Sequence, residues 1–349
     1  MDRHLIELPR KILVGYNVIR ELGSFIKDLG FGKEVLIISG EKVKSLIEKD
    51  VKESLSSFGL SYLWHHIDSA TMSFVGQVVD LAKKHQSKIL VGLGGGKSID
   101  VAKLSAYYAN LPFISVPTSA SHDGISSPFA SIKGMDKPYS LIAKPPIGVL
   151  ADIIIIANAP RRLLASGCGD LVAKITAVKD WELARDEKGE YFGNYAASLA
   201  RLSAKLVIDE SEKIREGSKE SVRDVVEALI SAGVAACIAG SSRPCSGSEH
   251  LFSHALDMLA PNIGLHGEKC GIGAIMMAKL HNLEWEKIAN SLKNVHAVVN
   301  AYELGINPEL IVDAILLAPK IRPERYTILH KLNLDRESAK NLAESVNVI

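Results

Sequence analysis

The sequence predicts an α/β domain with a mostly parallel sheet over residues 1–157, followed by an all-helical domain over residues 158–349. Three observations predict this fold class. In the first part, short β-branched runs alternate with amphipathic helical stretches, which is typical of parallel strands joined by helical crossovers. Asn158–Pro160 interrupts this pattern, and from Arg161 onward nearly every segment has helical spacing and helix-favouring residues. The length of 349 residues also favours two domains over one.

The expected strands are short apolar runs bounded by turn residues. They are Lys11–Val14, Glu34–Ser39, Ser61–Ile67, Lys88–Leu93, Pro112–Val116 and Ile153–Ile156. Helical spacing of the apolar residues predicts crossover helices at Val18–Leu29, Val75–His85 and Ile99–Asn110. In the second domain the same spacing predicts helices at Ser221–Ala239, Lys279–Leu292 and Asn307–Leu317, the last with Pro308 in its first turn.

The composition excludes several classes of protein. Lys and Arg together number 41 and Asp and Glu 40, so the net charge of +1 creates no general attraction for nucleic acid or an anionic membrane. The apolar runs fall short of the roughly 20 residues that a membrane span requires, and the N-terminus lacks the pattern of a secretory leader. We therefore expect a cytoplasmic protein with no nucleic-acid partner and no membrane insertion. The four cysteines form no CxxC pair and are expected to pack as reduced thiols without a catalytic role.

A glycine turn follows the expected strand Lys88–Leu93. The run Gly94–Gly96 precedes Lys97, Ser98 and Ile99 at the start of a helix. Glycines allow a ligand to approach the backbone and a helix N-terminus offers unpaired N–H groups, so the amides here can hold a pyrophosphate. Neither the GxGxxG fingerprint nor the Walker A pattern fits these residues, so the turn by itself leaves a purely structural role open. A small polar stretch over 118–127 is expected to be a functional loop.

Histidines and a carboxylate form a second candidate site. His250 and His254 lie four residues apart, hence on one helical face, and His266 follows across a loop. Neutral imidazoles held on a helix suit zinc, although a pair at this spacing also occurs as capping or packing residues. Asp170, in the glycine-rich segment Gly167–Lys174, supplies a carboxylate but could equally cap the start of a helix.

Three segments in this order resemble the iron-dependent alcohol dehydrogenase superfamily: GGGKSID at Gly94–Asp100, GCGDLVAK at Gly167–Lys174, and Glu249–Lys269. Within it, Leu8–Gly15 and Val116–Gly124 are most similar to the archaeal glycerol-1-phosphate dehydrogenase family. The resemblance covers essentially the whole chain. It implies a Rossmann-like first domain and, for the two domains together, a dehydroquinate synthase-like fold.

The resemblance also implies an activity and a set of residues for it. The family comprises NAD(P)-dependent, zinc-containing oxidoreductases that interconvert dihydroxyacetone phosphate and sn-glycerol 1-phosphate, the backbone of archaeal membrane ether lipids, so phospholipid biosynthesis is implied. It places Asp170, His250 and His266 at metal-ligand positions. Asp123, Asp170 and His254 fall at catalytic positions that face the substrate. The positions implied for NAD(H) or NADP(H) are Gly95, Gly96, Lys97, Ser98, Ile99, Thr118, Ser119, Ala120, Ser121 and Ser127.

The chain departs from the iron enzymes at one ligand position, and three other classes of protein are alternatives. The iron enzymes have a histidine four residues after the aspartate, whereas this chain has Lys174, which implies three protein ligands to a zinc that acts as Lewis acid. A glycerol dehydrogenase acting on the unphosphorylated polyol would keep the same ligands, and a dehydroquinate-synthase-like lyase is expected to have glutamate in place of Asp170. A nucleotide-binding module without chemistry is a third alternative.

The sequence also bears on the binding of the substrate phosphate, the preference between NADH and NADPH, and the oligomeric state. Lys174, Lys269 and Arg161 are the candidate cations for a substrate phosphate, because they flank the histidines and the aspartate. The preference between NADH and NADPH stays open, since Ser39–Glu41 offers neither a clear ribose-binding acid nor an arginine. A homo-oligomer is expected.

Overall fold

The computed structural model describes residues 4–133 and 140–349; the first three residues, at the N-terminus where no leader was expected, lie outside these ranges. The chain forms two compact units. The α/β unit comprises residues 5–120 and 124–159, and the helical unit comprises residues 121–123 and 160–349 together with His4. In the described ranges, no helix is both long enough and apolar enough to span a membrane.

Six parallel strands form the sheet of the α/β unit, in the order β1-β8-β5-β4-β2-β3. They are β1 (Lys11–Gly15), β2 (Val35–Ser39), β3 (Tyr62–His66), β4 (Ile89–Gly94), β5 (Phe113–Pro117) and β8 (Gly148–Asp152). The first five expected strands are confirmed. A separate antiparallel pair consists of β6 (Phe129–Ser131) and β7 (Ser140–Ile142).

The expected strand at Ile153–Ile156 is wrong. These residues form a short helix, α5 (Ile153–Ala157), and the strand is the preceding segment β8. Asp152 explains the difference, because its Oδ1 accepts hydrogen bonds from the N–H groups of Ile154 and Ile155 at 2.9 and 3.4 Å. This side-chain cap starts a helix in a run of isoleucines whose intrinsic preference is for a strand.

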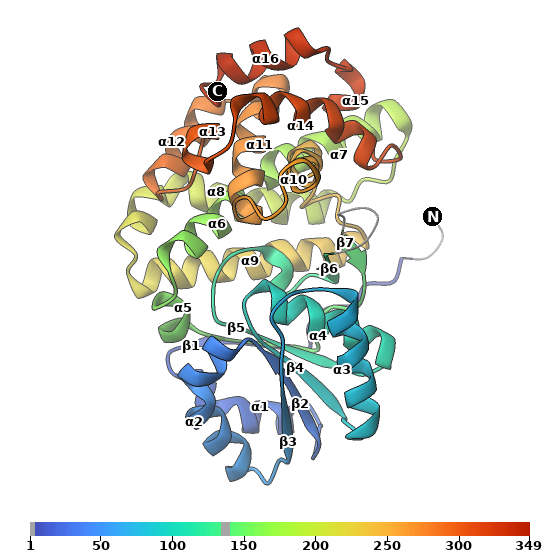
Figure 1. Cartoon of the computed structure of the whole chain (residues 1–349), viewed down its shortest axis with the longest axis vertical. Coiled ribbons are helices and arrows are strands. Elements are labelled where there is room, and N and C mark those ends of the chain that lie inside the picture. The colour runs from blue at the N-terminus through green and yellow to red at the C-terminus, as the bar shows by residue number, and fades with distance from the viewer. Residues whose placement is uncertain (1–3, 134–139) are drawn as a thin grey trace. The chain divides into compact units, whose positions relative to one another are not determined.

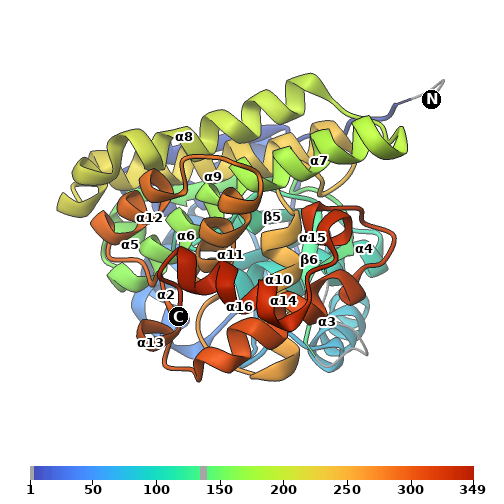
Figure 2. The same ribbon diagram turned by 90° about the horizontal axis from the view of Figure 1, so that it is seen from above.

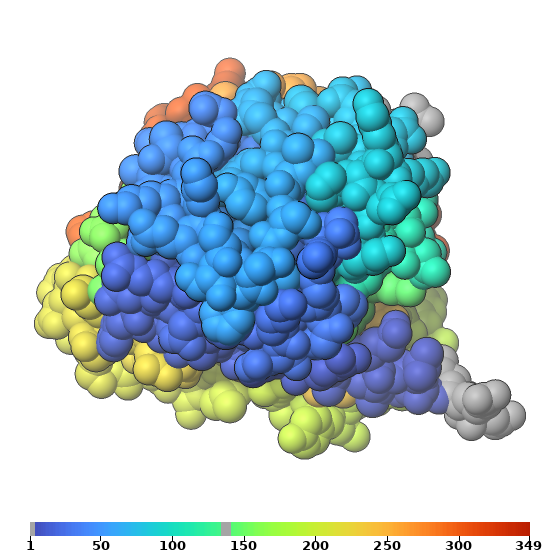
Figure 3. Space-filling view, turned by 90° about the horizontal axis from the view of Figure 1, so that it is seen from below, coloured from blue at the N-terminus to red at the C-terminus, as the bar shows by residue number. Residues whose placement is uncertain are grey.

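Helices cover both faces of the sheet (Figure 1). They are the 3-10 turn η1 (Val18–Glu21) and the helices α1 (Leu22–Asp28), α2 (Glu41–Ser57), α3 (Met72–Lys84) and α4 (Gly96–Ala109). A second 3-10 turn, η2 (Asp123–Ile125), lies in the polar loop. Phe25 of α1 and Leu55 of α2 share one apolar cluster with Val35, Ile37 and Val91 of the sheet. The three expected crossovers are confirmed, with Val18–Leu29 divided between η1 and α1. Figure 3 shows the surface that side chains of this unit form when seen from below.

The helical unit contains eleven helices within its described residues. They are α6 (Arg161–Val172), α7 (Lys174–Lys188), α8 (Asn194–Glu216), α9 (Lys219–Ala239), α10 (Ser248–Leu259), α11 (His266–Leu280), α12 (Trp285–Asn294), α13 (Ala301–Leu304), α14 (Pro308–Ile321), α15 (Ile328–Leu332) and α16 (Arg336–Ser345). The long helices α8 and α9 lie side by side along one edge, and α10 and α11 lie in the interior (Figure 2).

Two of the three helices expected here are confirmed as α9 and α14. The third, at Lys279–Leu292, is wrong as one continuous helix, because α11 ends at Leu280 and α12 begins at Trp285. Between them Asn282 adopts a positive φ of 55°. A left-handed residue of this kind ends a helix, and the apolar spacing continues through the turn without revealing it.

Candidate metal and substrate site

Two glycines let α6 and α11 approach each other backbone to backbone. A Cβ at Gly169 would lie 2.2 Å from the carbonyl oxygen of Gly267, and a Cβ at Gly267 would lie 1.8 Å from that of Ser166. This approach brings Asp170, in the last turn of α6, beside His266, the first residue of α11. Asp170 therefore lies inside a helix, and the alternative that it caps a helix start is wrong.

The other histidines come from α10, whose start is anchored by a carboxylate from α7. The N–H and Oγ of Ser248 donate to Asp180 Oδ2 at 2.7 and 2.5 Å, and Asp180 is completely buried. The anchor fixes the first turn of α10, which carries His250, and His254 follows one turn later. Both imidazoles are buried, and their rings lie 5.0 and 6.3 Å from that of His266.

Possible metal ligands converge here from three helices. One ligand atom from each of Asp170, His250, His266 and Cys270 lies within 4.8 Å of the others. Asp170 Oδ1 is 3.4 Å from His250 Nε2 and 3.8 Å from His266 Nε2. Ligands of tetrahedral zinc, bonded at about 2.0–2.3 Å, are separated from one another by roughly 3.3–3.8 Å. The donor set and its spacing therefore fit a single metal ion, and the three expected metal-ligand residues come together.

Cys270 is the member of this group that sequence reasoning missed. Its Sγ lies 3.5 Å from His266 Nε2, so Cys270 packs as a buried thiol, as expected of the cysteines, and also adjoins the ligand residues. It is fully buried and lies one turn after His266 on α11. This is the same i, i+4 spacing that singled out His250 and His254, so the signal was present in the sequence.

Lys174 links two carboxylates beside the metal ligands. Its Nζ lies 2.8 Å from Asp170 Oδ1 and 2.8 Å from Asp123 Oδ2, and its side chain is wholly buried. The N–H of Asp123 donates to Asp170 Oδ2 at 2.9 Å. Burial opposes the ammonium charge, but Asp123 and Asp170 raise the pKa of Lys174 well above its ordinary value. Lys174 thus pairs with both carboxylates in this structure, and its role as a candidate cation for the substrate phosphate stays a prediction.

The other two expected phosphate-binding cations also have partners in the protein. Lys269 is buried and forms an ion pair with Asp257. Arg161 donates to the carbonyl oxygen of Arg215 at 2.7 Å. Both side chains therefore meet protein groups in this structure, and their role toward a substrate phosphate stays a prediction.

Positive charge nevertheless gathers around His254. Burial, followed by the charges of His250, Lys269, Arg322 and Arg325, lowers the pKa of His254 to about 3. His254 is therefore a neutral imidazole at physiological pH, with one ring nitrogen that donates and one that accepts. The surrounding cations make this part of the helical unit suited to an anionic group.

Charge also favours metal binding at two of the ligands, Asp170 and His266. At His250 burial opposes the charged ring but is outweighed by Cys270, Asp170 and Glu249, which raise its pKa well above its ordinary value, so a metal would displace a proton there. Burial alone would raise the pKa of Asp170, but Lys174 above all, then His250 and His266, holds it well below its ordinary value. Burial and the neighbouring His250 lower the pKa of His266 well below its ordinary value. A carboxylate and a neutral imidazole are the protonation states that coordinate a metal.

The glycine turn between β4 and α4 has the expected form. Gly94 adopts a φ of +149°, and a Cβ there would lie 2.6 Å from Ser98 Oγ. The N–H groups of Ser98 and Ile99 donate to the Gly95 carbonyl at 3.1 and 3.3 Å. The amides suited to a phosphate are therefore the earlier ones, at residues 95–97, where the helix makes no internal use of its N–H groups.

The polar loop is divided between the two units. Thr118 N donates to Gly94 O at 3.0 Å, and a Cβ at Gly95 would lie 3.4 Å from Ser119 Oγ, so Thr118 and Ser119 adjoin the glycine turn. Ala120 and Ser127 are buried in the same unit. Ser121 belongs to the helical unit, where its carbonyl accepts a hydrogen bond from Ser166 Oγ at 3.3 Å.

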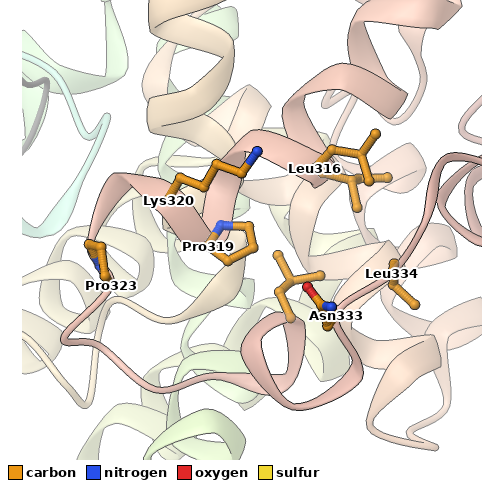
Figure 4. Close-up of a pocket in the computed structure, with 8 residues that line it drawn as sticks. Leu316, Pro319, Lys320, Pro323, Asn333 and Leu334 are labelled. Atoms are coloured by element: carbon orange, nitrogen blue, oxygen red, sulfur yellow. The ribbon is translucent and has the colours of Figure 1, made fainter.

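A pocket of about 240 Å³ between α14 and α15 is a different feature (Figure 4). It is lined by Ile315, Leu316, Pro319, Lys320, Pro323, Leu329, Asn333 and Leu334. Its mainly aliphatic lining includes neither the metal ligands nor His254, so it does not represent the candidate site.

Solved structures share this fold. The chain is similar to a probable glycerol dehydrogenase from Sinorhizobium meliloti, with a TM-score of 0.82, 20% identity, and coverage of 99% of this chain and 98% of that one. NADH-dependent butanol dehydrogenase A from Thermotoga maritima gives a TM-score of 0.77 and 20% identity, with 99% of each chain covered. The expected fold, a parallel α/β domain followed by an all-helical domain, is confirmed.

Sequence relatives extend over the full length. Residues 13–160 match the family described as iron-containing alcohol dehydrogenase. The chain is 51% identical to glycerol-1-phosphate dehydrogenase [NAD(P)+] of Nitrosopumilus maritimus, over 100% of this chain and 98% of that protein. It is 50% identical to the enzyme of the same name from Pyrococcus horikoshii, over 99% of this chain and 100% of that protein. With the geometry of the glycine turn and of the ligand cluster, these similarities confirm the resemblance seen in the sequence: the chain belongs to the glycerol-1-phosphate dehydrogenase family of the iron-containing alcohol dehydrogenases.

Proposed function

We propose that the protein catalyses the reversible NAD(P)H-dependent reduction of dihydroxyacetone phosphate to sn-glycerol 1-phosphate. The observation that carries this proposal is the convergence of Asp170, His250 and His266 in a chain half identical over its whole length to glycerol-1-phosphate dehydrogenases. The product would serve as the glycerol backbone of archaeal-type membrane ether lipids, which places the enzyme in phospholipid biosynthesis.

The ligand set favours zinc as the metal. Two neutral imidazoles and a carboxylate are ligands of catalytic zinc, and the thiol of Cys270 beside them adds a soft donor that zinc accepts readily. Zinc bound by Asp170, His250 and His266 would stabilise the negative charge that develops on the substrate's carbonyl oxygen.

We assign the nicotinamide cofactor to the glycine turn. The amides at residues 95–97 lie at the N-terminus of α4, where they and the helix dipole favour a pyrophosphate. Thr118 and Ser119 adjoin the same turn and offer hydroxyl groups to the cofactor. Bound NAD(P)H would supply the hydride.

Asp123 and His254 are the residues proposed to act on the substrate. The Asp123 side chain is 17% exposed, and its ion pair with Lys174 holds the carboxylate in place to accept a hydrogen bond from a substrate hydroxyl. His254 is neutral, so it relays a proton by donating from one ring nitrogen while accepting at the other. It does not hold a proton in reserve as an imidazolium.

The cations near His254 favour a phosphorylated substrate over a free polyol. Arg322, which pairs with Glu324 at 3.0 Å, and Arg325, which donates to Ser246 O at 2.6 Å, add positive charge to the surroundings of His254. The overall net charge of the chain is only +1. Such a local excess stabilises a phosphate dianion and is of no use to uncharged glycerol.

Parallel spectrophotometric assays test the proposal. Oxidation of NADH and of NADPH is followed with dihydroxyacetone phosphate, dihydroxyacetone and glyceraldehyde 3-phosphate as substrates. Reduction of NAD(P)+ is followed with glycerol. The product is analysed on a chiral column. We expect the highest kcat/KM with dihydroxyacetone phosphate and sn-glycerol 1-phosphate as product. A preference for dihydroxyacetone or glycerol would overturn the proposal and favour a glycerol dehydrogenase.

An arginine variant tests the phosphate assignment separately. Arg322→Gln should raise KM for dihydroxyacetone phosphate and leave the rate with dihydroxyacetone unchanged, because only the phosphorylated substrate meets that charge. Lys320→Gln, on the same segment but lining the unrelated pocket, is the matched control. Equal losses on both substrates would assign Arg322 a structural role.

A further inference from the structure

Glu249 is a buried carboxylate adjacent in sequence to the metal-ligand residue His250. Its side chain is completely buried, and Oε1 lies 2.8 Å from His250 Nδ1. Oε1 also accepts the N–H of Gly247 at 2.6 Å, and Oε2 accepts the hydroxyl of Thr176 at 2.8 Å. Among the described residues, the ion-pair partner of Glu249 is His250 alone.

This geometry determines which nitrogen of His250 carries the proton when the ring is neutral, as a metal ligand must be. An ionised carboxylate only accepts hydrogen bonds, so Nδ1 of His250 must be the donor. The lone pair of the neutral ring is then on Nε2, the atom that lies 3.4 Å from Asp170 Oδ1 among the other ligands. The contact thus selects the tautomer that can coordinate a metal through Nε2.

The carboxylate is held so that it cannot turn away from the ring. The N–H of Gly247 binds one of its oxygens and the hydroxyl of Thr176 binds the other. Helix α11 packs closely against the backbone of the same residue, since a Cβ at Gly273 would lie 3.0 Å from both the Cα and the carbonyl oxygen of Glu249. A rigid, fully buried acceptor orients the ring before any metal arrives.

We propose that Glu249 is a positioning residue for the metal site, which fixes the tautomer and orientation of His250 and strengthens its Nε2 as a ligand. The inference rests on the metal occupancy proposed above. Hydrogen-bonded carboxylates behind a metal-bound histidine typically contribute about 10–100-fold to metal affinity. His266 differs, because its Nδ1 has the weakly bonding Cys270 Sγ at 3.9 Å as its described partner, while Nε2 lies 3.5 Å from the same sulfur and 3.8 Å from Asp170 Oδ1.

Two variants separate the charge of Glu249 from its hydrogen bond. In Glu249→Gln the amide oxygen can still accept from Gly247 and His250, while the amide NH2 donates to Thr176 Oγ1, whose own hydrogen can go to Ala173 O at 3.0 Å. The shape and the bonds therefore remain, and the charge is lost. Glu249→Ala removes the charge and the bond to the ring.

The experiment measures metal binding directly by the full-length protein. Zinc dissociation constants are determined by competition with a chromophoric chelator, and the visible d–d spectrum of the cobalt-substituted protein reports ligand geometry. We expect zinc affinity to fall about tenfold in Glu249→Gln and about 100-fold in Glu249→Ala, and the cobalt spectrum of Glu249→Ala to change. Circular dichroism of the metal-free variants checks that they are folded; if Glu249→Ala is not, Glu249→Gln decides.

Glu268→Gln is the matched control. Glu268 is also buried and lies near the ligands, but it binds Arg162 and the N–H of Leu265 and no imidazole ring. Its zinc affinity should stay within about twofold of wild type, because an effect of this size needs a contact with the ligand. Equal losses in Glu268→Gln and Glu249→Gln, or wild-type affinity in both Glu249 variants, would overturn the inference while leaving the proposed function intact. A wild-type protein that binds no zinc would overturn both.

Discussion

Replacing Asp180 by Asn should destabilise the helical unit although the change is nearly isosteric. Asp180 Oδ1 accepts hydrogen bonds from Ile328 N at 2.7 Å and His281 Nε2 at 3.0 Å, and Oδ2 accepts from the N–H and Oγ of Ser248. An asparagine has one oxygen and one NH2 group, so its NH2 must face one of these two pairs of donors. Whichever way it turns, a buried backbone N–H of Ser248 or Ile328 loses its acceptor.

The magnitude follows from the bonds that are lost. A buried donor left unsatisfied costs about 1–3 kcal/mol, and a hydrogen bond to a charged group is worth about 1.5–3 kcal/mol. One orphaned N–H and one weakened charged bond together predict a loss of about 3–5 kcal/mol in the free energy of unfolding.

Urea unfolding at 25 °C, followed by circular dichroism on the metal-free protein, measures this loss. The control is Asp186→Asn on the same helix, whose exposed carboxylate pairs with Arg185, and its effect should stay within about 0.5 kcal/mol. A loss below about 1 kcal/mol for Asp180→Asn would refute the reasoning, because it would mean that the buried donors find other acceptors.

Three further predictions concern the cofactor, the metal and pH. Gly95→Val should weaken NAD(P)H binding, measured by calorimetry, at least about tenfold and leave the zinc content unchanged. The backbone at φ −79° tolerates valine, but the valine side chain covers the phosphate-binding amides, so unchanged NAD(P)H affinity would contradict the assignment. Removing zinc with a chelator should lower the free energy of unfolding by about 2.7 kcal/mol relative to protein in zinc at 100 times Kd. Added zinc should restore this stability in wild type but not in His250→Ala, and the same response in both proteins would argue against His250 as a ligand. The pKa of His254 falls from an ordinary 6.5 to about 3 on folding, so the unfolded chain binds its proton first and stability is lost as pH drops below 6.5. Between pH 7.5 and 5.5, wild type should lose about 1.4 kcal/mol more than His254→Gln in urea unfolding, and parallel losses would exclude a buried neutral His254.

Local sequence patterns determined much of the fold. The inner strands β2, β4 and β5 are apolar runs buried on both faces. The glycine turn at Gly94 needs a backbone conformation that other residues avoid, so these strands and the turn could be recognised without tertiary contacts. The helical spacing of His250 and His254 likewise placed two imidazoles on one face of α10. Errors arose where one side chain changed the outcome of a general preference: the Asp152 cap turned isoleucines with strand preference into α5.

Only the tertiary structure decided what each chemical group meets. Asp170 lies near His266 because Gly169 and Gly267 allow two helices, far apart in the chain, to touch through their backbones. Periodicity shows which face of a helix is buried, but not which other helix covers it. For the same reason the sequence made Lys174 a candidate cation for a substrate phosphate, whereas in the structure it is buried between Asp123 and Asp170 and pairs with both. The sequence by itself therefore determined most of the helices and strands and the residue types of the metal ligands. Long-range packing determined which side chains contact these ligands and which charge states they adopt, because contacts and charge states both depend on burial that no local pattern records.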